Sequence, residues 1–319
     1  MSVSEARIRA ICLTGPTATG KTELALELAK SIPLEIVSVD SAMVYRGMDI
    51  GTAKPNPEVR AAVPHHLIDI VDAADTYSAG RFLADARAAI DAIAARGKLP
   101  LLVGGTLLYL RALRRGLAPL PDADPELRAE IDREAHRVGW PVLHARLAAV
   151  DPEAAARIAP NDRQRIQRAL EVYMRTGKPL SVLQREAAAA SGTGTATDTD
   201  ILMLAVVPSD RGQLAARIER RFDAMVEAGL VGEVESLMAR GDLTADMPSM
   251  RAVGYRQIWA YLERRYDWPV ARQKAIAATR QLAKRQMTWL RSEPSVETFE
   301  AFSPGLAEKL LERVGSECR

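Results

Sequence analysis

The chain has 319 residues, 48% of them hydrophobic and 26% charged, which indicates a globular protein with more than one domain or a large insertion. Its net charge of +2 excludes a basic field over the whole surface, so any nucleic acid must be bound by local patches. Four His and two Cys, with no C-x-x-C pair, argue against a zinc site and suit a reduced, cytoplasmic protein. No apolar run reaches the ~18 residues of a membrane span and no signal-peptide pattern is present, so we expect no membrane association.

A phosphate-binding loop lies near the start of the chain, between an apolar run at residues 8–13 and a helical pattern at residues 22–31. It matches G-x-x-x-x-G-K-[ST] and consists of Gly15, Pro16, Thr17, Ala18, Thr19, Gly20, Lys21 and Thr22. In such a loop backbone N–H groups turn toward phosphate oxygens, the helix N-terminus adds partial positive charge, and Lys21 adds a full charge. Thr22 can offer its hydroxyl to Mg²⁺. The loop predicts a bound polyphosphate without identifying the molecule that carries it.

Asp40 follows the next predicted strand, at residues 34–39, and opens a long segment broken by Gly and Pro that runs to residue 55. A carboxylate at the end of a strand beside a phosphate loop lies where α/β proteins bind ligands. Asp40 is equally typical of a helix cap or a turn. His65 and His66 begin a short predicted strand at residues 65–69. Because no other ligand stands at metal-binding spacing, we interpret both as structural or substrate-adjacent.

Further β-α units follow this segment. A helix is predicted at residues 78–96, with an inner stripe of Phe82, Ala86, Ile90 and Ile93. A buried strand at residues 99–103 leads into a Gly-Gly-Thr turn ending at Thr106, and an apolar helix follows at residues 107–113. Such a turn either lets a ligand approach the backbone or is a plain tight turn. The alternation predicts an α/β fold, a P-loop NTPase-like core whose parallel sheet is flanked by helices.

The pattern becomes all-helical between residues 119 and 200, which predicts a helical insertion domain in a core formed by residues 1–118 and 201–319. Helices are expected at residues 125–138, 141–150, 152–158, 163–176 and 181–186, followed by a flexible low-complexity connection at residues 187–199. In the fourth helix Ile166, Leu170 and Tyr173 form the inner stripe, with Gln164 and Arg168 facing away. A Gln/Arg-rich face of this kind reads RNA or is simply solvated.

The last part of the chain returns to the sheet with a strand at residues 201–207 and ends in basic helices. Arg217 and Arg221 share one face of a helix at residues 214–228, where they either hold a pyrophosphate or pair with acids such as Glu219. A helix at residues 231–239, a basic and aromatic turn at residues 250–257 and a helix at residues 258–265 follow. The final long helix, residues 270–291, carries six Lys or Arg and no acid, which suits a polyanion.

Taken together these motifs resemble the bacterial tRNA dimethylallyltransferases (tRNA isopentenyltransferases) over nearly the whole chain. The resemblance rests on residues 15–22, 40–43, 51–55, 66–69, 104–106, 161–168, 217–222, 253–257 and 279–286. Eukaryotic relatives add a Cys/His zinc finger that two Cys cannot supply. The resemblance implies transfer of a dimethylallyl group from dimethylallyl diphosphate to the exocyclic amino group of the adenosine 3′-adjacent to the anticodon in tRNA.

The resemblance also implies roles for individual residues. Asp40 is the expected general base, and Lys21, the loop N–H groups, Mg²⁺ on Thr22 and Arg217 are expected to stabilise the leaving diphosphate. The target base must leave its stack to reach the donor. The expected tRNA contacts are Asp40, Ser41, Ala42, Met43, Thr106, Arg128, Gln164, Arg165, Ile166, Gln167, Arg168, Arg251, Ala252, Val253, Gly254, Tyr255, Arg256, Arg280 and Lys284. We expect a monomer that grips the anticodon stem-loop with its helical insertion.

Three alternatives remain at the level of sequence. A P-loop kinase of a nucleotide or small metabolite fits the loop alone, although the basic helices do not favour it. A prenyltransferase acting on free adenine nucleotides would need neither the insertion nor the basic terminal helix. An RNA-binding GTPase-like switch is disfavoured because the chain lacks a guanine-reading N-K-x-D motif.

Overall fold

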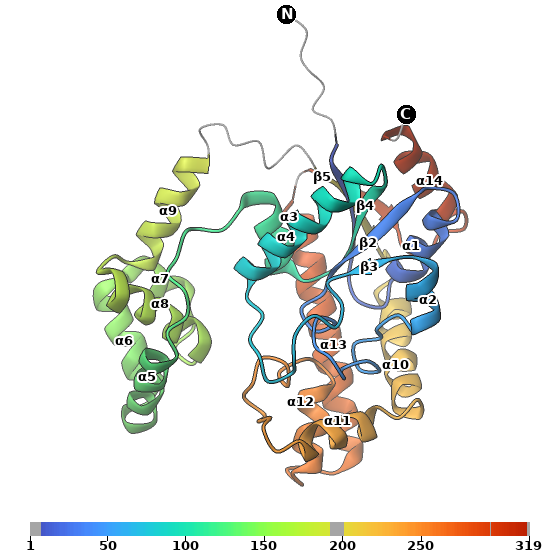
Figure 1. The fold of residues 1–319 in the computed structure, drawn as a ribbon. Coiled ribbons are helices and arrows are strands. Elements are labelled where there is room, and N and C mark those ends of the chain that lie inside the picture. Colours follow the sequence, from blue (N-terminus) through green and yellow to red (C-terminus); the bar gives the residue numbers. More distant parts are fainter. Residues whose placement is uncertain (1–7, 192–200, 294, 318–319) are drawn as a thin grey trace, which may run out of the picture. The chain divides into compact units, whose positions relative to one another are not determined.

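The computed structural model describes residues 8–191, 201–293 and 295–317 (Figure 1). Its chain divides into two compact units, Met1–Arg114 with Thr197–Arg319, and Arg115–Ala196. Among the described residues no helix is both long and apolar enough to cross a membrane.

A six-stranded, fully parallel sheet forms the centre of the first unit, with the strand order β3-β2-β4-β1-β5-β6. The strands are β1 (Ala10–Thr14), β2 (Leu34–Val39), β3 (His65–His66), β4 (Leu99–Gly104), β5 (Ile201–Val207) and β6 (Val296–Glu300). The sequences of β1 and β5 are almost continuously apolar, as expected for strands covered on both faces. The register pairs Val39 with Gly104 and Thr14 with Gly104, so the carboxyl ends of β2, β4 and β1 meet at one edge.

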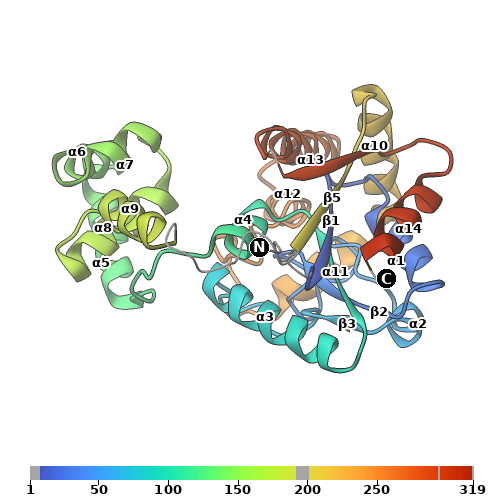
Figure 2. The same ribbon diagram turned by 90° about the horizontal axis from the view of Figure 1, so that it is seen from above.

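Helices cover both faces of this sheet (Figure 2). The helices of this unit are α1 (Lys21–Ala29), α2 (Pro57–Ala62), α3 (Ala79–Ala95), α4 (Leu107–Arg115), α10 (Arg211–Glu227), α11 (Leu230–Ala239), α12 (Tyr255–Leu262), α13 (Trp268–Arg291) and α14 (Leu306–Glu317). The apolar sides of α1 and α14 pack on one face, and those of α3, α4 and α10 to α13 form the core on the other. Ser78, Asp210 and Asp267 cap α3, α10 and α13 through their side chains, which fixes where these helices begin.

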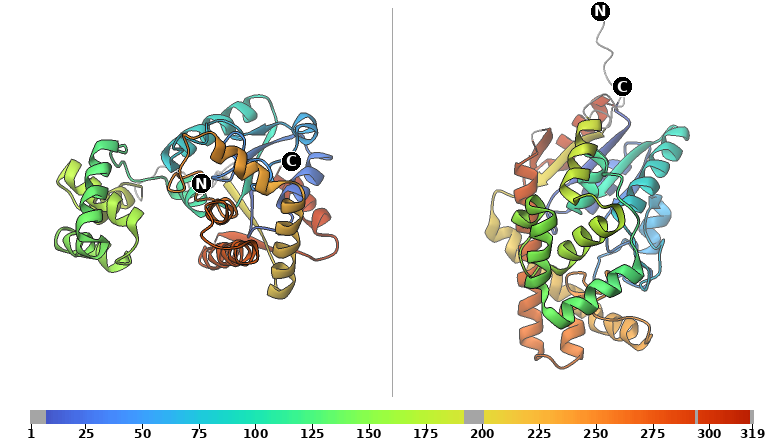
Figure 3. Two further views of the ribbon diagram at one scale, coloured as in Figure 1. Left: turned by 90° about the horizontal axis from the view of Figure 1, so that it is seen from below. Right: turned by 90° about the vertical axis from the view of Figure 1, so that its left-hand side faces the viewer.

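The second unit is a bundle of helices with its own core (Figure 3). Its helices are α5 (Pro125–Val138), α6 (Trp140–Val150), α7 (Pro152–Arg157), α8 (Arg163–Thr176) and α9 (Leu180–Ser191). Leu143, Leu147, Ile166 and Leu170 are buried in that core. Glu171 is buried as well, with 0% exposure, and it accepts hydrogen bonds from the guanidinium groups of its neighbours Arg128 and Arg168.

Most predicted elements are found, including the inner stripe of α3, and the predicted α/β class is confirmed. The structure differs from the local predictions in several places. The strand expected at residues 65–69 ends at His66, and β6, α2 and α14 were not expected. The flexible connection expected at residues 187–199 begins as helix, because α9 continues to Ser191; residues 192–199 lie outside the described residues. Tyr173 is only partly buried, while Ala169 and Val172 complete the inner face of α8.

Candidate active site

The phosphate loop connects β1 to α1 at the carboxyl edge of the sheet. Gly15 has φ 148°, and a Cβ at this position would lie 2.3 Å from the carbonyl oxygen of Val206, so only glycine fits beside β5. Gly20 has φ 86° and precedes the first turn of α1. The Nζ of Lys21 donates to the carbonyl oxygens of Gly15 at 3.0 Å and Pro16 at 2.7 Å. The loop therefore forms a closed turn, and Lys21 folds back onto its carbonyl oxygens. A bound phosphate group would replace these oxygens as the partner of Lys21.

The electrostatics of Lys21 mark the loop as an anion site. Burial and, to a smaller extent, the positive charge of Arg221 lower the pKa of Lys21 to about 8, while Asp40 and Glu23 act in the opposite direction. Burial likewise lowers the pKa of Arg221, with Asp40 and Glu23 opposing. Two cations thus share a poorly solvated region, and an added anion would relieve their repulsion.

Asp40 stands directly after β2 at the same edge. Its Oδ1 accepts hydrogen bonds from the backbone N–H groups of Ala42 at 2.8 Å and Met43 at 3.3 Å, so Asp40 does shape the turn, as one sequence interpretation expected. Its Oδ2 accepts no hydrogen bond from any other described residue. The turn fixes the carboxylate and leaves one oxygen for a ligand, so the structural and catalytic interpretations of Asp40 are compatible.

The Gly-Gly-Thr turn after β4 is joined to the Asp40 turn. The Oγ1 of Thr106 accepts a hydrogen bond from the N–H of Ser41 at 3.0 Å, and the N–H of Thr106 donates to Val39 O at 3.2 Å. A Cβ on Gly104 would lie 2.2 Å from Val39 O, so the close approach of the two turns requires glycine. The turns that carry Thr106 and Asp40 are therefore held together by one side-chain and one backbone hydrogen bond.

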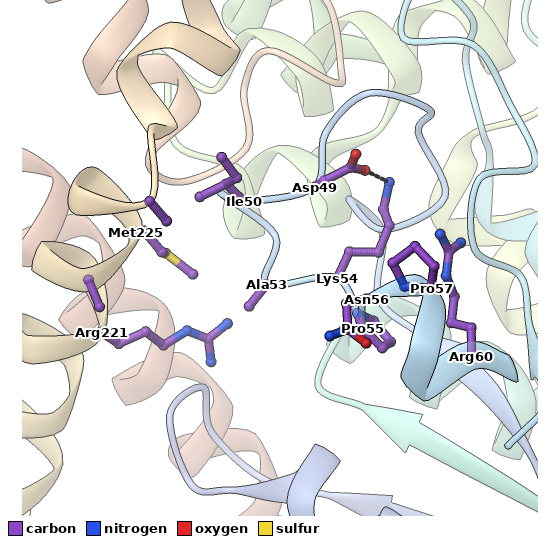
Figure 4. A pocket seen from close by; sticks show the side chains of 12 residues that line it. Asp49, Ile50, Ala53, Lys54, Pro55, Asn56, Pro57, Arg60, Arg221 and Met225 are labelled. Atoms are coloured by element: carbon purple, nitrogen blue, oxygen red, sulfur yellow. Dashed lines mark hydrogen bonds and ion pairs between the residues drawn. The ribbon is translucent and has the colours of Figure 1, made fainter. Parts of the chain in front are cut away.

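Arginines of α10 approach the phosphate loop from a different element. The Nε of Arg217 donates to Ala18 O at 3.0 Å, and its guanidinium lies 5.0 Å from the centroid of the Phe302 ring. Arg221 extends from α10 into a cavity of about 480 Å³ (Figure 4). That cavity is lined by Asp49, Ile50, Ala53, Lys54, Pro55, Asn56, Pro57, Arg60, Arg221, Ala224, Met225 and Ala228.

The expected alternative, that these arginines pair with Glu219, is wrong. Glu219 forms its ion pairs with Arg272 and Arg280 of α13. The positive charges of Arg217 and Arg221 are thus not neutralised by Glu219 and can act on the phosphate loop, whereas the charge of Arg280 is partly neutralised. Arg221 was recognised in the sequence only as a neighbour of Arg217 four positions away. Its burial beside Lys21, which gives it its importance, is a tertiary property.

The segment after Asp40 is held by charged side chains. Glu233 of α11 accepts hydrogen bonds from the successive N–H groups of Asp49, Ile50 and Gly51 at 2.8, 2.7 and 3.1 Å. Lys54, whose side chain is 2% exposed, pairs with Asp49 and Asp69. These contacts hold the loop in place, and no local sequence pattern revealed the part that Glu233 plays in it.

Comparison with known proteins decides the family. A family model described as IPP transferase matches residues 43–293, and one described as isopentenyl transferase matches residues 8–66. The tRNA dimethylallyltransferase of Ralstonia pickettii is 58% identical over 307 residues, covering 96% of this chain and 94% of the relative. That of Thioalkalivibrio sulfidiphilus is 60% identical over 291 residues, covering 91% and 89%. The chain belongs to the IPP transferase family. It is a tRNA dimethylallyltransferase-type prenyltransferase, as the sequence predicted, with dimethylallyl diphosphate as co-substrate.

Solved structures agree with this assignment. The tRNA isopentenylpyrophosphate transferase of Bacillus halodurans is 36% identical, has a TM-score of 0.69, and covers 98% of this chain and 97% of its own. A eukaryotic dimethylallyltransferase, solved acting on tRNA, is 26% identical with a TM-score of 0.73, covering 92% of this chain and 73% of its own. The predicted core, a parallel sheet flanked by helices, is confirmed.

The expected tRNA contacts divide into accessible and inaccessible side chains. The expected side-chain contacts of Tyr255 and Ile166 are corrected, because both side chains are 0% exposed. The ring of Tyr255 packs on Gly51 and its hydroxyl donates to Glu233. Ile166 lies in the core of the helical unit. The backbone of Gly254 is buried too. Ala42, Met43, Thr106, Ala252 and Val253 are partly buried, and Ser41 is exposed.

The charged and amide candidates also differ among themselves. Arg128 and Arg168 are engaged by Glu171, and the Nε2 of Gln167 donates to Asp132. Exposed side chains belong to Gln164, Arg165, Arg251, Arg256, Arg280 and Lys284. The exposed set is the part of the prediction that can meet an RNA without rearrangement of the core.

The paired histidines take structural partners, as expected. The Nε2 of His66 lies 2.7 Å from the buried carboxylate of Glu35, and the Nδ1 of His65 lies 2.6 Å from Val63 O. Within the described ranges no three His, Cys, Asp or Glu side chains gather as a metal site.

Proposed function

We propose that this protein transfers the dimethylallyl group of dimethylallyl diphosphate to the exocyclic amino nitrogen of the adenosine 3′-adjacent to the anticodon in tRNA. The products are isopentenyladenosine and diphosphate. The observation that carries the proposal is the fixed Asp40 carboxylate at the sheet edge that also bears the phosphate loop, Lys21 and Arg221. An acid-base group and an anion site at one edge suit a reaction that removes a proton and releases diphosphate.

In this proposal the donor diphosphate lies in residues 15–22. Its oxygens accept hydrogen bonds from loop N–H groups other than that of Thr17, which donates to Gln286, and they replace Gly15 O and Pro16 O as partners of Lys21. Arg217, anchored at Ala18 O, and Arg221 add positive charge where negative charge develops as the bond between allylic carbon and oxygen breaks. Preformed charges of this kind cost little reorganisation during the reaction.

The acceptor nitrogen forms the new bond to the allylic carbon, and the electron pair of the broken carbon–oxygen bond leaves with diphosphate. The nitrogen then loses a proton to the Oδ2 of Asp40, which has no competing partner among the described residues. Thr106, bonded to Ser41 beside Asp40, orients the adenine. Holding the two reactants in line supplies much of the acceleration, because it replaces a bimolecular encounter.

The residues fit a bound Mg²⁺ of the kind that diphosphates bring. Thr22 stands in the first turn of α1 directly after Lys21, and a lone hydroxyl suits an ion that keeps several waters and is held mainly by substrate oxygens. When bound there, the ion would neutralise charge on the diphosphate.

Recognition of tRNA, in the same proposal, uses the exposed basic and amide side chains. In the helical unit, the side chains that contact the anticodon stem-loop are Gln164, Arg165, Arg128 and Arg168. Arg251, Arg256, Arg280 and Lys284 meet its phosphates, because exposed Lys and Arg bind a backbone without sequence preference. We further propose that the protein is cytoplasmic and acts as a monomer. Light scattering with and without tRNA would test whether it is a monomer.

The deciding experiment incubates the protein with dimethylallyl diphosphate, Mg²⁺ and an unmodified tRNA transcript, and detects isopentenyladenosine by mass spectrometry. A transcript with guanosine at the target position is the matched substrate control and should gain nothing. If no isopentenyladenosine forms in the adenosine transcript, the proposal is refuted. Parallel reactions separate the alternatives: prenylation of AMP indicates a free-nucleotide enzyme, and ATP consumption without prenyl transfer indicates a kinase.

A further inference from the structure

A buried glutamine of α13 joins the phosphate loop to the turn that carries Thr106. Gln286 is 5% exposed although it lies on a strongly basic helix. Its Oε1 accepts a hydrogen bond from the N–H of Thr17 at 3.0 Å, and its Nε2 donates to Gly105 O at 2.8 Å. One side chain thus bonds both loops at the carboxyl edge of the sheet.

The chemistry of the junction selects an amide. A backbone N–H requires an acceptor and a carbonyl oxygen requires a donor, so the orientation of the amide is fixed by its partners. A carboxylate would oppose Gly105 O with negative charge, and an apolar side chain of the same length would leave both groups without their bonds. The fit is tight: a Cβ on Gly105 would lie 2.4 Å from the Nε2 of Gln286 and 2.9 Å from Gly15 O.

The two loops held by Gln286 carry the two halves of the proposed reaction. Thr17 belongs to the loop proposed to bind the diphosphate. Gly105 immediately precedes Thr106, whose Oγ1 accepts from the N–H of Ser41 next to Asp40. The phosphate loop is therefore joined to the turn of the proposed base by the two hydrogen bonds of Gln286, the peptide link from Gly105 to Thr106, and the hydrogen bond from Ser41 to Thr106.

We infer that Gln286 is a positioning residue, which sets the leaving diphosphate in register with the acceptor side of the site. This inference rests on the proposed function, and it adds a residue that touches neither substrate. Reactants misplaced by ~1 Å lose rate about 100-fold in well-ordered sites, so a loosened junction is expected to act on the chemical step.

The test replaces Gln286 by methionine, which keeps the length of the side chain and removes both hydrogen bonds. Gln273, an exposed glutamine of the same helix with no role assigned above, supplies the control Gln273→Met. We expect Gln286→Met to lower the single-turnover rate about 10- to 100-fold at saturating donor and tRNA, and to weaken donor binding several-fold. Its tRNA dissociation constant should stay within about twofold of wild type, and Gln273→Met should match wild type throughout.

A double-mutant cycle with Thr106→Ala tests whether Gln286 acts through the turn. If it does, the combined loss of rate is smaller than the product of the two single losses, because both variants disturb one junction. Multiplicative losses, a wild-type rate in folded Gln286→Met, or a fall in tRNA affinity as large as the fall in rate would overturn the inference. Thermal unfolding shows whether Gln286→Met is folded. If it is not, Gln286→Glu is used in its place, because it has the same shape but puts a negative charge beside Gly105 O, and the same loss of rate is expected. Failure of wild type to form product would instead refute the proposed function.

Discussion

At the scale of single residues, a substitution of Asp40 can separate the structural role of its side chain from its chemical role. Its Oδ1 holds the turn through the N–H groups of Ala42 and Met43, and asparagine keeps that oxygen. We expect Asp40→Asn to retain the fold and bind the donor within a few-fold of wild type, while the single-turnover rate falls about 10²- to 10⁴-fold because the base is lost. Stopped reactions followed by mass spectrometry measure the rate. If Asn works normally and only Ala fails, the carboxylate serves the turn alone.

Lys21 makes donor binding depend on pH. Burial and Arg221 lower its pKa to about 8 in the free protein, so above that pH the lysine is increasingly neutral. Donor diphosphate favours the charged form, and binding then requires uptake of a proton. We expect donor affinity to fall as pH rises above about 8, measured by calorimetry in buffers of different ionisation heat. Lys21→Met should bind weakly and lose this dependence.

The same pKa has an effect of opposite sign on stability. Between about pH 8 and the ordinary lysine value of 10.5, the unfolded chain binds the proton and the folded chain does not. Stability contributed by this group therefore rises with pH across that window. Lys21→Met should remove that contribution from the pH dependence of chemical denaturation, and an unchanged dependence would show that Lys21 titrates normally.

Arg221 can be tested against its neighbour in the sequence. Arg221 is partly buried beside Lys21 and extends into the cavity of Figure 4, whereas Arg220 is exposed. Arg221→Ala should weaken donor binding by about 10-fold or more, since a charge-assisted contact to phosphate is worth about 1.5–3 kcal/mol. Arg220→Ala is the control, with an expected change below twofold in a donor titration. Equal effects of the two variants would remove Arg221 from the donor site.

At the scale of elements, the segment after Asp40 depends on a clamp formed by Glu233 and Tyr255. Glu233 accepts three backbone N–H groups and the hydroxyl of Tyr255. Removing a hydrogen bond to a charged acceptor costs about 1.5–3 kcal/mol, so Tyr255→Phe should lower the free energy of unfolding by that amount. Tyr266→Phe is the control, because its hydroxyl donates only to the neutral Gln257 O and should cost about 0.5–1.5 kcal/mol. Similar losses in urea denaturation would argue against a charged clamp.

The elements that sequence reasoning found and missed differ in how local their signals are. The stripe of α3 and the strand-loop-helix of the phosphate loop follow from nearby residues, and both were predicted. β6 is a short edge strand with exposed positions, and only its pairing with β5 defines it. Tyr255 stands in a basic segment that suggests a surface. Its burial depends on Gly51 and Glu233, which lie far from it in the chain. Residues whose role depends on distant partners were the ones misread.

At the scale of the whole molecule, the helical unit carries the proposed contacts to tRNA, and their salt dependence can be separated from stability. Arg165 is 70% exposed and only weakly paired with Asp162 at 3.5 Å, whereas Arg168 holds the buried Glu171. Arg165→Ala should leave the unfolding midpoint unchanged, weaken tRNA binding and reduce the slope of log K against log salt by about 0.7–0.9, as one lost phosphate contact predicts. Arg168→Ala should weaken binding and also destabilise the unit, because Glu171 then keeps Arg128 alone of its two guanidinium partners.

Filter binding of unmodified tRNA between 50 and 300 mM salt, roughly the range in which counterion release is strong, measures both slopes. Arg146→Ala is the control within the same unit, because the guanidinium of Arg146 is already bonded to both oxygens of Glu134. It should change neither slope nor affinity. A slope for Arg165→Ala equal to that of Arg146→Ala would make the basic face of α8 a solvated surface. Recognition would then rest on the exposed cations of the α/β unit, among which Lys284→Ala offers the corresponding test.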